Sequence, residues 1–138
     1  MAEETREDAL AADLAARVEA LPALVNGDPW LVHRGRFLDV GILLELGRAR
    51  YYLTIARGRI VAMERGAGPM PSWRLAFRAG EAAWRRFWQP MPAPHDHDVF
   101  ALAKRGELSI EGDLQPFMAN LLYFKDVLAA PRRAQSGV

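Results

Sequence analysis

The segment from Leu108 to Leu128 runs from a short alternating strand directly into a strongly apolar helix. Gly112 and Asp113 separate the two elements, and Asp113 is a suitable N-cap for the helix. The apolar stripe of this helix is wider than that of a typical surface helix, with members at positions 114, 117, 118, 121, 122, 124 and 128. Such a helix needs a large apolar partner, so the segment predicts a helix that covers a core or a cavity.

Strands with one apolar face provide that partner. Alternation and short turns predict antiparallel strands at about 36–46, 51–56 and 59–64. After a predicted loop at 66–71, Trp73, Leu75 and Phe77 alternate with charged or small residues, which predicts a further strand. Because successive side chains of a strand point to opposite faces, each of these strands has one apolar face.

Predicted helices flank these strands in the sequence. An amphipathic helix is predicted at 4–20, a second helix at 81–89, and a short third helix that ends near Lys104. An antiparallel sheet with one apolar face, and with helices gathered on that face, is typical of an α+β domain. The order of the elements therefore predicts the α+β class.

Composition indicates a single cytoplasmic domain. The 138 residues are enough for one core, and we expect a helical lead-in at 1–35, a core at 36–130 and a frayed tail at 131–138. The absence of cysteine excludes disulfides and thiolate metal sites, and no apolar run matches a signal peptide or a membrane span. Stable membrane insertion is therefore not expected. The high arginine and alanine content is typical of a GC-rich bacterial genome.

Charge is distributed unevenly, although the net charge is only +1. Residues 47–86 contain nine arginines against Glu64 and Glu81, an excess that could attract an anion. Arg74 and Arg78 alternate with apolar residues of the predicted strand instead of with exposed aromatics. A solvated outer face of the sheet is the favoured interpretation, and nucleic-acid binding is not expected.

Two segments contain residues that could carry polar chemistry. The His95–Asp98 segment holds metal-type ligands, but its two histidines point in opposite directions in an extended chain, so a capping loop is favoured. Trp84 and Trp88 lie one helical turn apart, with Arg85 and Arg86 beside them to meet a carboxylate or phosphate, although core packing is the commoner role. No serine lies in a nucleophile elbow and no acid and base pair stands out, so neither an enzyme nor a bound metal or cofactor is expected.

The order and motifs of the chain resemble the sterol carrier protein 2 family. The resemblance covers about residues 36–130 and rests on LLELGRARYYLTIARGRIVAM, SWRLAFRAG and FALAKRGELSIEGDLQPFMANLLYFKDVL. It implies a five-stranded, mainly antiparallel sheet with helices packed on one face, which enclose an apolar tunnel for a lipid, a fatty acid or a fatty acyl-CoA. It implies binding and presentation of that ligand without catalysis, and a homodimer or a partner enzyme stays open.

By position, the inner strand faces and the final helix would line this tunnel, and the tryptophan pair could cap its mouth. The ligand-binding residues expected on this basis are Leu44, Leu46, Leu53, Ile55, Trp73, Leu75, Phe77, Trp84, Trp88, Phe117, Leu121 and Phe124. An alternative stays open, because the aromatic side chains among them could fill the space themselves. The chain would then be an interaction or accessory protein that works through its surface.

Overall fold

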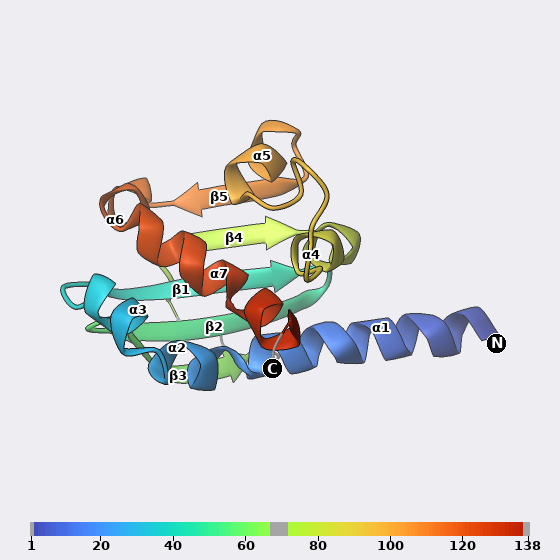
Figure 1. Cartoon of the computed structure of the whole chain (residues 1–138), viewed down its shortest axis with the longest axis horizontal. Coiled ribbons are helices and arrows are strands. Elements are labelled where there is room, and N and C mark those ends of the chain that lie inside the picture. Colours follow the sequence, from blue (N-terminus) through green and yellow to red (C-terminus); the bar gives the residue numbers. More distant parts are fainter. Residues whose placement is uncertain (1, 67–71, 137–138) are drawn as a thin grey trace.

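The computed structural model describes residues 2–66 and 72–136, which form helices on one side of a five-stranded sheet (Figure 1). The helices are α1 (Ala2–Glu19), α2 (Leu21–Asn26), α3 (Pro29–Arg34), α4 (Glu81–Phe87), α5 (Val99–Lys104), α6 (Leu114–Ala119) and α7 (Leu121–Ser136). The strands are β1 (Asp39–Leu46), β2 (Ala49–Ala56), β3 (Arg59–Arg65), β4 (Leu75–Ala79) and β5 (Leu108–Gly112). We call the helix-covered face of the sheet the inner face and the opposite one the outer face.

The strands follow the order β3-β2-β1-β4-β5 across the sheet. β1 pairs antiparallel with β2, β2 with β3, and β4 with β5, while β1 and β4 run parallel. The predicted α+β fold with a five-stranded, mainly antiparallel sheet is therefore confirmed. The predicted loop at 66–71 lies outside the described residues, apart from Gly66.

Two short helices that the sequence analysis did not predict connect α1 to the sheet. Pro22 and Pro29 each lie in the first turn of a helix, where a missing amide hydrogen leaves no intrahelical bond unmade. The Asp28 carboxylate accepts a hydrogen bond from the Leu31 amide at 3.2 Å and caps α3. Because the chain is helical here, β1 begins at Asp39 and not near residue 36.

The apolar helix predicted after Asp113 is two helices that meet at Asn120. Asp113 caps α6 as predicted, because its carboxylate accepts a hydrogen bond from the Gln115 amide at 3.1 Å. Asn120 has non-helical dihedral angles (φ −127°, ψ 39°), and its side-chain amide donates to the Pro116 carbonyl oxygen at 3.0 Å. The break separates the short α6 from α7, which crosses the inner face of the sheet (Figure 1).

The predicted frayed tail at 131–138 is wrong for the residues that the structure describes. α7 continues through Pro131 to Ser136, and Pro131 is buried. Arg132 donates from Nε and Nη2 to the Phe87 carbonyl oxygen at 2.9 and 2.5 Å. These bonds join the last helix to the end of α4. Residues 137–138 lie outside the described part of the chain.

Trp73 lies on the outer face of the sheet, whereas the alternation in the sequence places it on the inner face. It precedes β4 and packs against a small outer-face cluster of Leu43, Tyr52 and Ala76. The chain bends at Arg74, so the period-2 pattern of β4 does not extend back to residue 73. Trp73 is therefore separated from the other predicted ligand-binding residues.

A close junction of three chain segments holds α7 against the sheet. The Tyr123 hydroxyl donates a hydrogen bond to the Gly58 carbonyl oxygen at 2.7 Å, in the buried interior. Gly58 has a φ of +81°, and a Cβ there would lie 2.5 Å from the Val32 carbonyl oxygen. A Cβ on Gly35 would lie 2.5 Å from the Tyr123 ring. Glycine at both positions lets the segments approach.

We predict that Gly58→Ala lowers the free energy of unfolding by about 1–3 kcal/mol, because alanine is strained at a positive φ. Chemical denaturation followed by tryptophan fluorescence measures the change. Gly80→Ala is the matched control, because Gly80 has a φ of −72° and an added Cβ there meets nothing within 4 Å. Equal losses of stability in the two variants would contradict the role assigned to Gly58.

Candidate functional site

Eleven of the twelve residues predicted to bind an apolar ligand belong to one apolar cluster, the inner-face cluster, which fills the space between the sheet and the helices. Ten of them are buried, namely Leu44, Leu46, Leu53, Ile55, Leu75, Phe77, Trp84, Trp88, Phe117 and Phe124. The eleventh, Leu121, is partly buried against them. Only Trp73 of the predicted set lies elsewhere.

Aromatic rings occupy the centre of the inner-face cluster. The Phe117 ring centroid lies 5.6 Å from that of Phe77 and 5.7 Å from that of Phe124, and the last two are 5.9 Å apart. Each of the three side chains is at most 1% exposed. An apolar ligand that enters the cluster therefore has to separate these rings.

Trp84 of α4 and Trp88, the C-cap residue of that helix, form one part of the cluster. Their ring centroids are 5.0 Å apart, in agreement with the predicted helical spacing. Trp84 Nε1 donates to the Glu45 carbonyl oxygen at 3.0 Å, and Trp88 Nε1 donates to the Leu128 carbonyl oxygen at 2.7 Å. Both indoles are fixed parts of the core rather than an open stacking surface.

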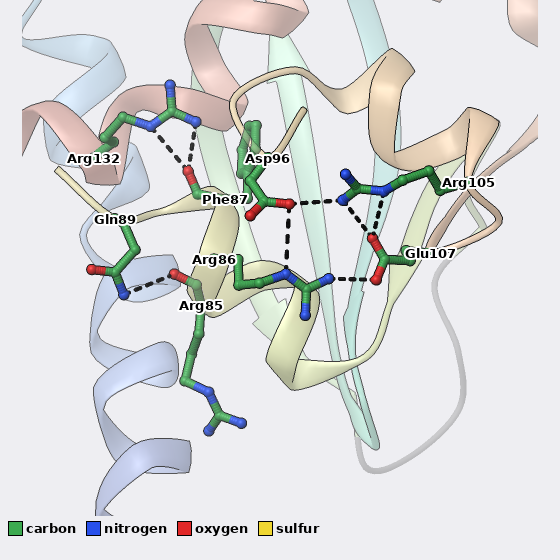
Figure 2. Close-up of polar contacts among 8 residues, drawn as sticks. All are labelled: Arg85, Arg86, Phe87, Gln89, Asp96, Arg105, Glu107 and Arg132. Atoms are coloured by element: carbon green, nitrogen blue, oxygen red, sulfur yellow. Dashed lines mark hydrogen bonds and ion pairs between the residues drawn. The ribbon is translucent and has the colours of Figure 1, made fainter. Parts of the chain in front are cut away.

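The arginines beside this pair do not face the cluster. Arg86 contacts Asp96 Oδ1 at 3.6 Å and Glu107 Oε1 at 2.5 Å, and Arg105 contacts the same two side chains at 2.7 and 2.6 Å (Figure 2). Figure 2 shows the side chain of Arg85 directed away from this network. The network ties α4 to the loop before α5 and to the residue before β5, which gives Arg86 a structural role.

The His95–Asp98 segment is a capping loop, as the sequence favours. The Asp98 carboxylate accepts a hydrogen bond from the Phe100 amide at 3.0 Å and caps α5, and both histidines are exposed. Within the described ranges, no three His, Asp or Glu side chains are arranged to hold a metal ion. Over the same ranges, none of the helices combines the length and the apolar character that spanning a bilayer requires.

The outer face carries the alternating charges that the sequence predicts. Glu45 contacts Arg78 at 2.7 Å and Arg50 at 3.3 Å, and Arg78 also contacts Glu111 at 2.7 Å. Burial by itself raises the pKa of Glu45, but the hydrogen bonds and charges of Arg78 and Arg50 outweigh burial and lower it. These arginines are therefore largely neutralised by their own neighbours.

Two hollows at the surface are lined in part by residues of the inner-face cluster. The elements that line them, α1 with the β1–β2 turn in one case and the α6–α7 break in the other, lie near opposite ends of the sheet (Figure 1). The first hollow, of about 270 Å³, lies between α1 and the β1–β2 turn and is lined in part by Leu46. The second hollow, of about 490 Å³, lies at the α6–α7 break and is lined in part by Leu121. Each hollow therefore contains one of the predicted ligand-binding residues.

Large apolar side chains are exposed at the α6–α7 break, on α3 and just after α3. Met118 and Leu122, which are 58% and 63% exposed, line the second hollow together with Arg34. Trp30 is 81% exposed and lines a neighbouring hollow that also contains Arg34, and Phe37, just after α3, is 85% exposed. We call these four apolar residues the apolar end. Exposed apolar groups on neighbouring elements are typical of contact with a ligand, a protein or a membrane.

Three residues that line the first hollow, Arg48, Tyr51 and Arg65, are not marked as site residues by the local sequence pattern. The arginine excess at 47–86 was the available signal. Which of those arginines border a hollow depends on the pairing of Tyr51 with Arg65 between β2 and β3, and on where α1 packs. Neither can be obtained from local periodicity.

The structure is similar to several solved structures. It matches the crystal structure of sterol carrier protein 2 with a TM-score of 0.68 and 12% identity, over 85% of this chain and 94% of that one. It also matches a protein of Thermus thermophilus, described as possibly a sterol carrier protein, with a TM-score of 0.60, 12% identity and 88% of each chain. A third match is UbiJ-SCP2, a ubiquinone synthesis protein, with a TM-score of 0.54 and 15% identity, over 83% of this chain and 87% of that one.

The chain therefore has the sterol carrier protein 2 fold, and the resemblance seen in its motifs is confirmed at the level of the fold. At 12% to 15% identity these likenesses establish the fold alone. No protein-family model matches the sequence, and no curated protein matches it. What the site binds has to be argued from its own residues.

We predict that Asp96→Asn reduces the dependence of stability on pH below about pH 5. The hydrogen bond from Arg105 lowers the pKa of Asp96 and likewise that of Glu107. A lowered carboxylate pKa stabilises the fold above the unfolded-state value, about 4 for these groups, and the stabilisation is lost as pH falls through the folded-state value. Thermal unfolding between about pH 7 and pH 2 measures the effect.

Glu64→Gln is the control for this prediction. Glu64 is an exposed carboxylate of β3 and forms no ion pair with any described residue. Its substitution removes the same charge without affecting the network of Arg86 and Arg105. Unfolding curves of Asp96→Asn that run parallel to those of the unmodified protein at every pH would contradict the prediction.

Proposed function

We propose that the chain is a non-catalytic carrier module for an apolar ligand, namely a lipid, a fatty acid or a fatty acyl-CoA. The observation that carries the proposal is the inner-face cluster, in which one sheet face and the last two helices gather apolar side chains from distant parts of the sequence. The fold supports it, because the similar structures include sterol carrier protein 2.

Binding in this proposal rests on the burial of the ligand. Each methylene group removed from water contributes about 0.8 kcal/mol, so a long chain binds tightly with few polar contacts. The ligand would occupy the space between the inner face and α6 and α7. Phe117 and Phe124 would then pack against the ligand instead of against Phe77.

The α6–α7 break is the part of the fold best suited to make that room. α6 has six residues, of which only Pro116 and Phe117 are buried. Asn120, between the two helices, already has non-helical dihedral angles. A helix held by so few buried side chains separates from the core at a lower free-energy cost than a deeply packed one.

We predict that Leu121→Trp weakens the binding of a fluorescent fatty acid by about tenfold, because the larger side chain takes up space next to the inner-face cluster. Displacement titrations measure the affinity, and native mass spectrometry of gently purified protein should show a bound lipid. Leu122→Trp is the matched control, because Leu122 is the next residue of α7 and is 63% exposed.

Three results would count against the internal carrier site. Equal weakening by Leu121→Trp and Leu122→Trp would place the ligand in the second hollow, on the surface. Protein that carries no lipid and takes up no fatty acid would refute the carrier function. Full affinity in the Leu121→Trp variant would show that the ligand does not occupy the space around this residue.

The second candidate function is an interaction or accessory protein with a filled core, and the apolar end favours it. Trp30 and Phe37, at 81% and 85% exposed, have lost almost no contact with water on folding.

Under this candidate, the double variant Trp30→Ser/Phe37→Ser abolishes self-association measured by analytical ultracentrifugation. A protein that stays monomeric before the substitution would exclude pairing through this end, and fatty-acid uptake by the same variant separates the two candidates.

A further inference from the structure

The first hollow combines an apolar floor with a basic rim. Its floor consists of Leu46 and of alanine and leucine side chains of α1, and its rim includes Arg48, Arg50 and Arg65. Leu46 also belongs to the inner-face cluster. The hollow is therefore open to solvent on one side and is bordered on the other by a side chain of the apolar core.

Tyr51 adds a buried polar group to the wall of this hollow. Its side chain is 2% exposed, and its hydroxyl has no hydrogen-bond partner among the described residues. Burial raises the pKa of Tyr51, although the charge of Arg65 opposes the rise, so the hydroxyl is protonated at neutral pH and available as a donor. A buried donor without a partner is costly, and an acceptor brought by a ligand would remove that cost.

Two of the rim arginines keep their charge available. Arg50 contacts Glu45 at 3.3 Å, whereas Arg48 and Arg65 form no ion pair with any described residue. Arg65 Cζ lies 5.6 Å from the centroid of the Tyr51 ring, so this guanidinium is adjacent to the buried tyrosine. A free guanidinium beside an unpartnered hydroxyl is suited to an oxyanion.

Two carboxylates also lie near the hollow. Glu81 is part of its lining, and Glu19 is close enough to Tyr51 to act on its pKa. A Cβ placed on Gly47 would lie 3.0 Å from the Glu81 Cγ, so Glu81 is packed against the β1–β2 turn. The carboxylates offer no donor to an anion, and they leave Arg48, Arg65 and the Tyr51 hydroxyl as the groups that can bind one.

We propose that the first hollow binds an oxyanion, a carboxylate or a phosphate, which is the head group of the apolar ligand. Arg48 and Arg65 supply charged N–H donors, and the Tyr51 hydroxyl supplies a neutral one. The apolar chain of the ligand passes over Leu46 into the inner-face cluster. The head-group assignment rests on the proposed carrier function, whereas the anion site does not.

Three probes test the anion site and the head-group assignment separately, namely dodecanoate, dodecanol and inorganic phosphate. Dodecanoate is expected to bind about tenfold more tightly than dodecanol in calorimetric titrations, because only dodecanoate brings the oxyanion. The double variant Arg48→Gln/Arg65→Gln is expected to abolish this preference and to leave dodecanol binding unchanged. Arg36→Gln/Arg59→Gln is the control, because it removes the same charge from exposed residues outside the hollow.

Tyr51→Phe tests the hydroxyl by two readouts. It is expected to reduce the preference for dodecanoate, and it is expected not to lower the melting temperature, because the hydroxyl has no partner in the ligand-free protein. A clear loss of stability together with an unchanged preference would remove Tyr51 from the site.

The outcomes for the two proposals differ. Equal affinity for dodecanoate and dodecanol would overturn the anion site and leave the carrier function in place. If neither binds but inorganic phosphate shifts the amide resonances of Gly47, Arg48 and Gly66, the site takes a free anion and the carrier function fails. A preference for dodecanoate that survives in Arg48→Gln/Arg65→Gln would also overturn the site. No response to any probe would overturn both proposals.

Discussion

The hydrogen bond from the Tyr123 hydroxyl to the Gly58 carbonyl oxygen fixes the last helix to the turn between β2 and β3. Burial raises the pKa of Tyr123, so the hydroxyl remains a donor over the pH range in which proteins are usually folded. The bonds from Trp88 to the Leu128 carbonyl oxygen and from Arg132 to the Phe87 carbonyl oxygen hold the other half of α7. Without α7 in this position the apolar inner face would be open to water, so the packing of the core depends on these bonds.

Local signals in the sequence predicted the elements whose pattern is independent of the rest of the chain. The hairpin strands, the α+β class, the capping loop at His95–Asp98 and the cap at Asp113 belong to this group, because alternation and capping are decided within a few neighbouring residues. The errors occurred where a distant segment decides the local structure. The chain bends at Arg74, and Trp73 therefore lies on the outer face, where it packs against residues of other strands. Pro131 lies inside a helix whose end is held by bonds to Phe87.

The candidate site divides in the same way. The inner-face cluster followed from alternation, because residues two apart on a strand share a face wherever the strand lies. The first hollow could not be predicted from alternation. It forms only because the strand register places Arg65 opposite Tyr51 and because α1 packs beside both residues. For Arg86 the local pattern was misleading. Its place beside the tryptophans suggested a contact with a ligand head group, but in the structure its guanidinium forms ion pairs with Asp96 and Glu107.

The filled core and the proposed carrier function are compatible because different parts of the cluster are held by different forces. Trp84 and Trp88 are tied to main-chain carbonyl groups and are costly to move, whereas Phe117 is held by packing alone on a short helix. Leu46 lies opposite Ala79 and Leu44 opposite Phe77 in the register of β1 with β4. Leu46, which lines the first hollow, is therefore one strand repeat, roughly 7 Å, along β1 from Leu44, which lies opposite Phe77 of the aromatic centre.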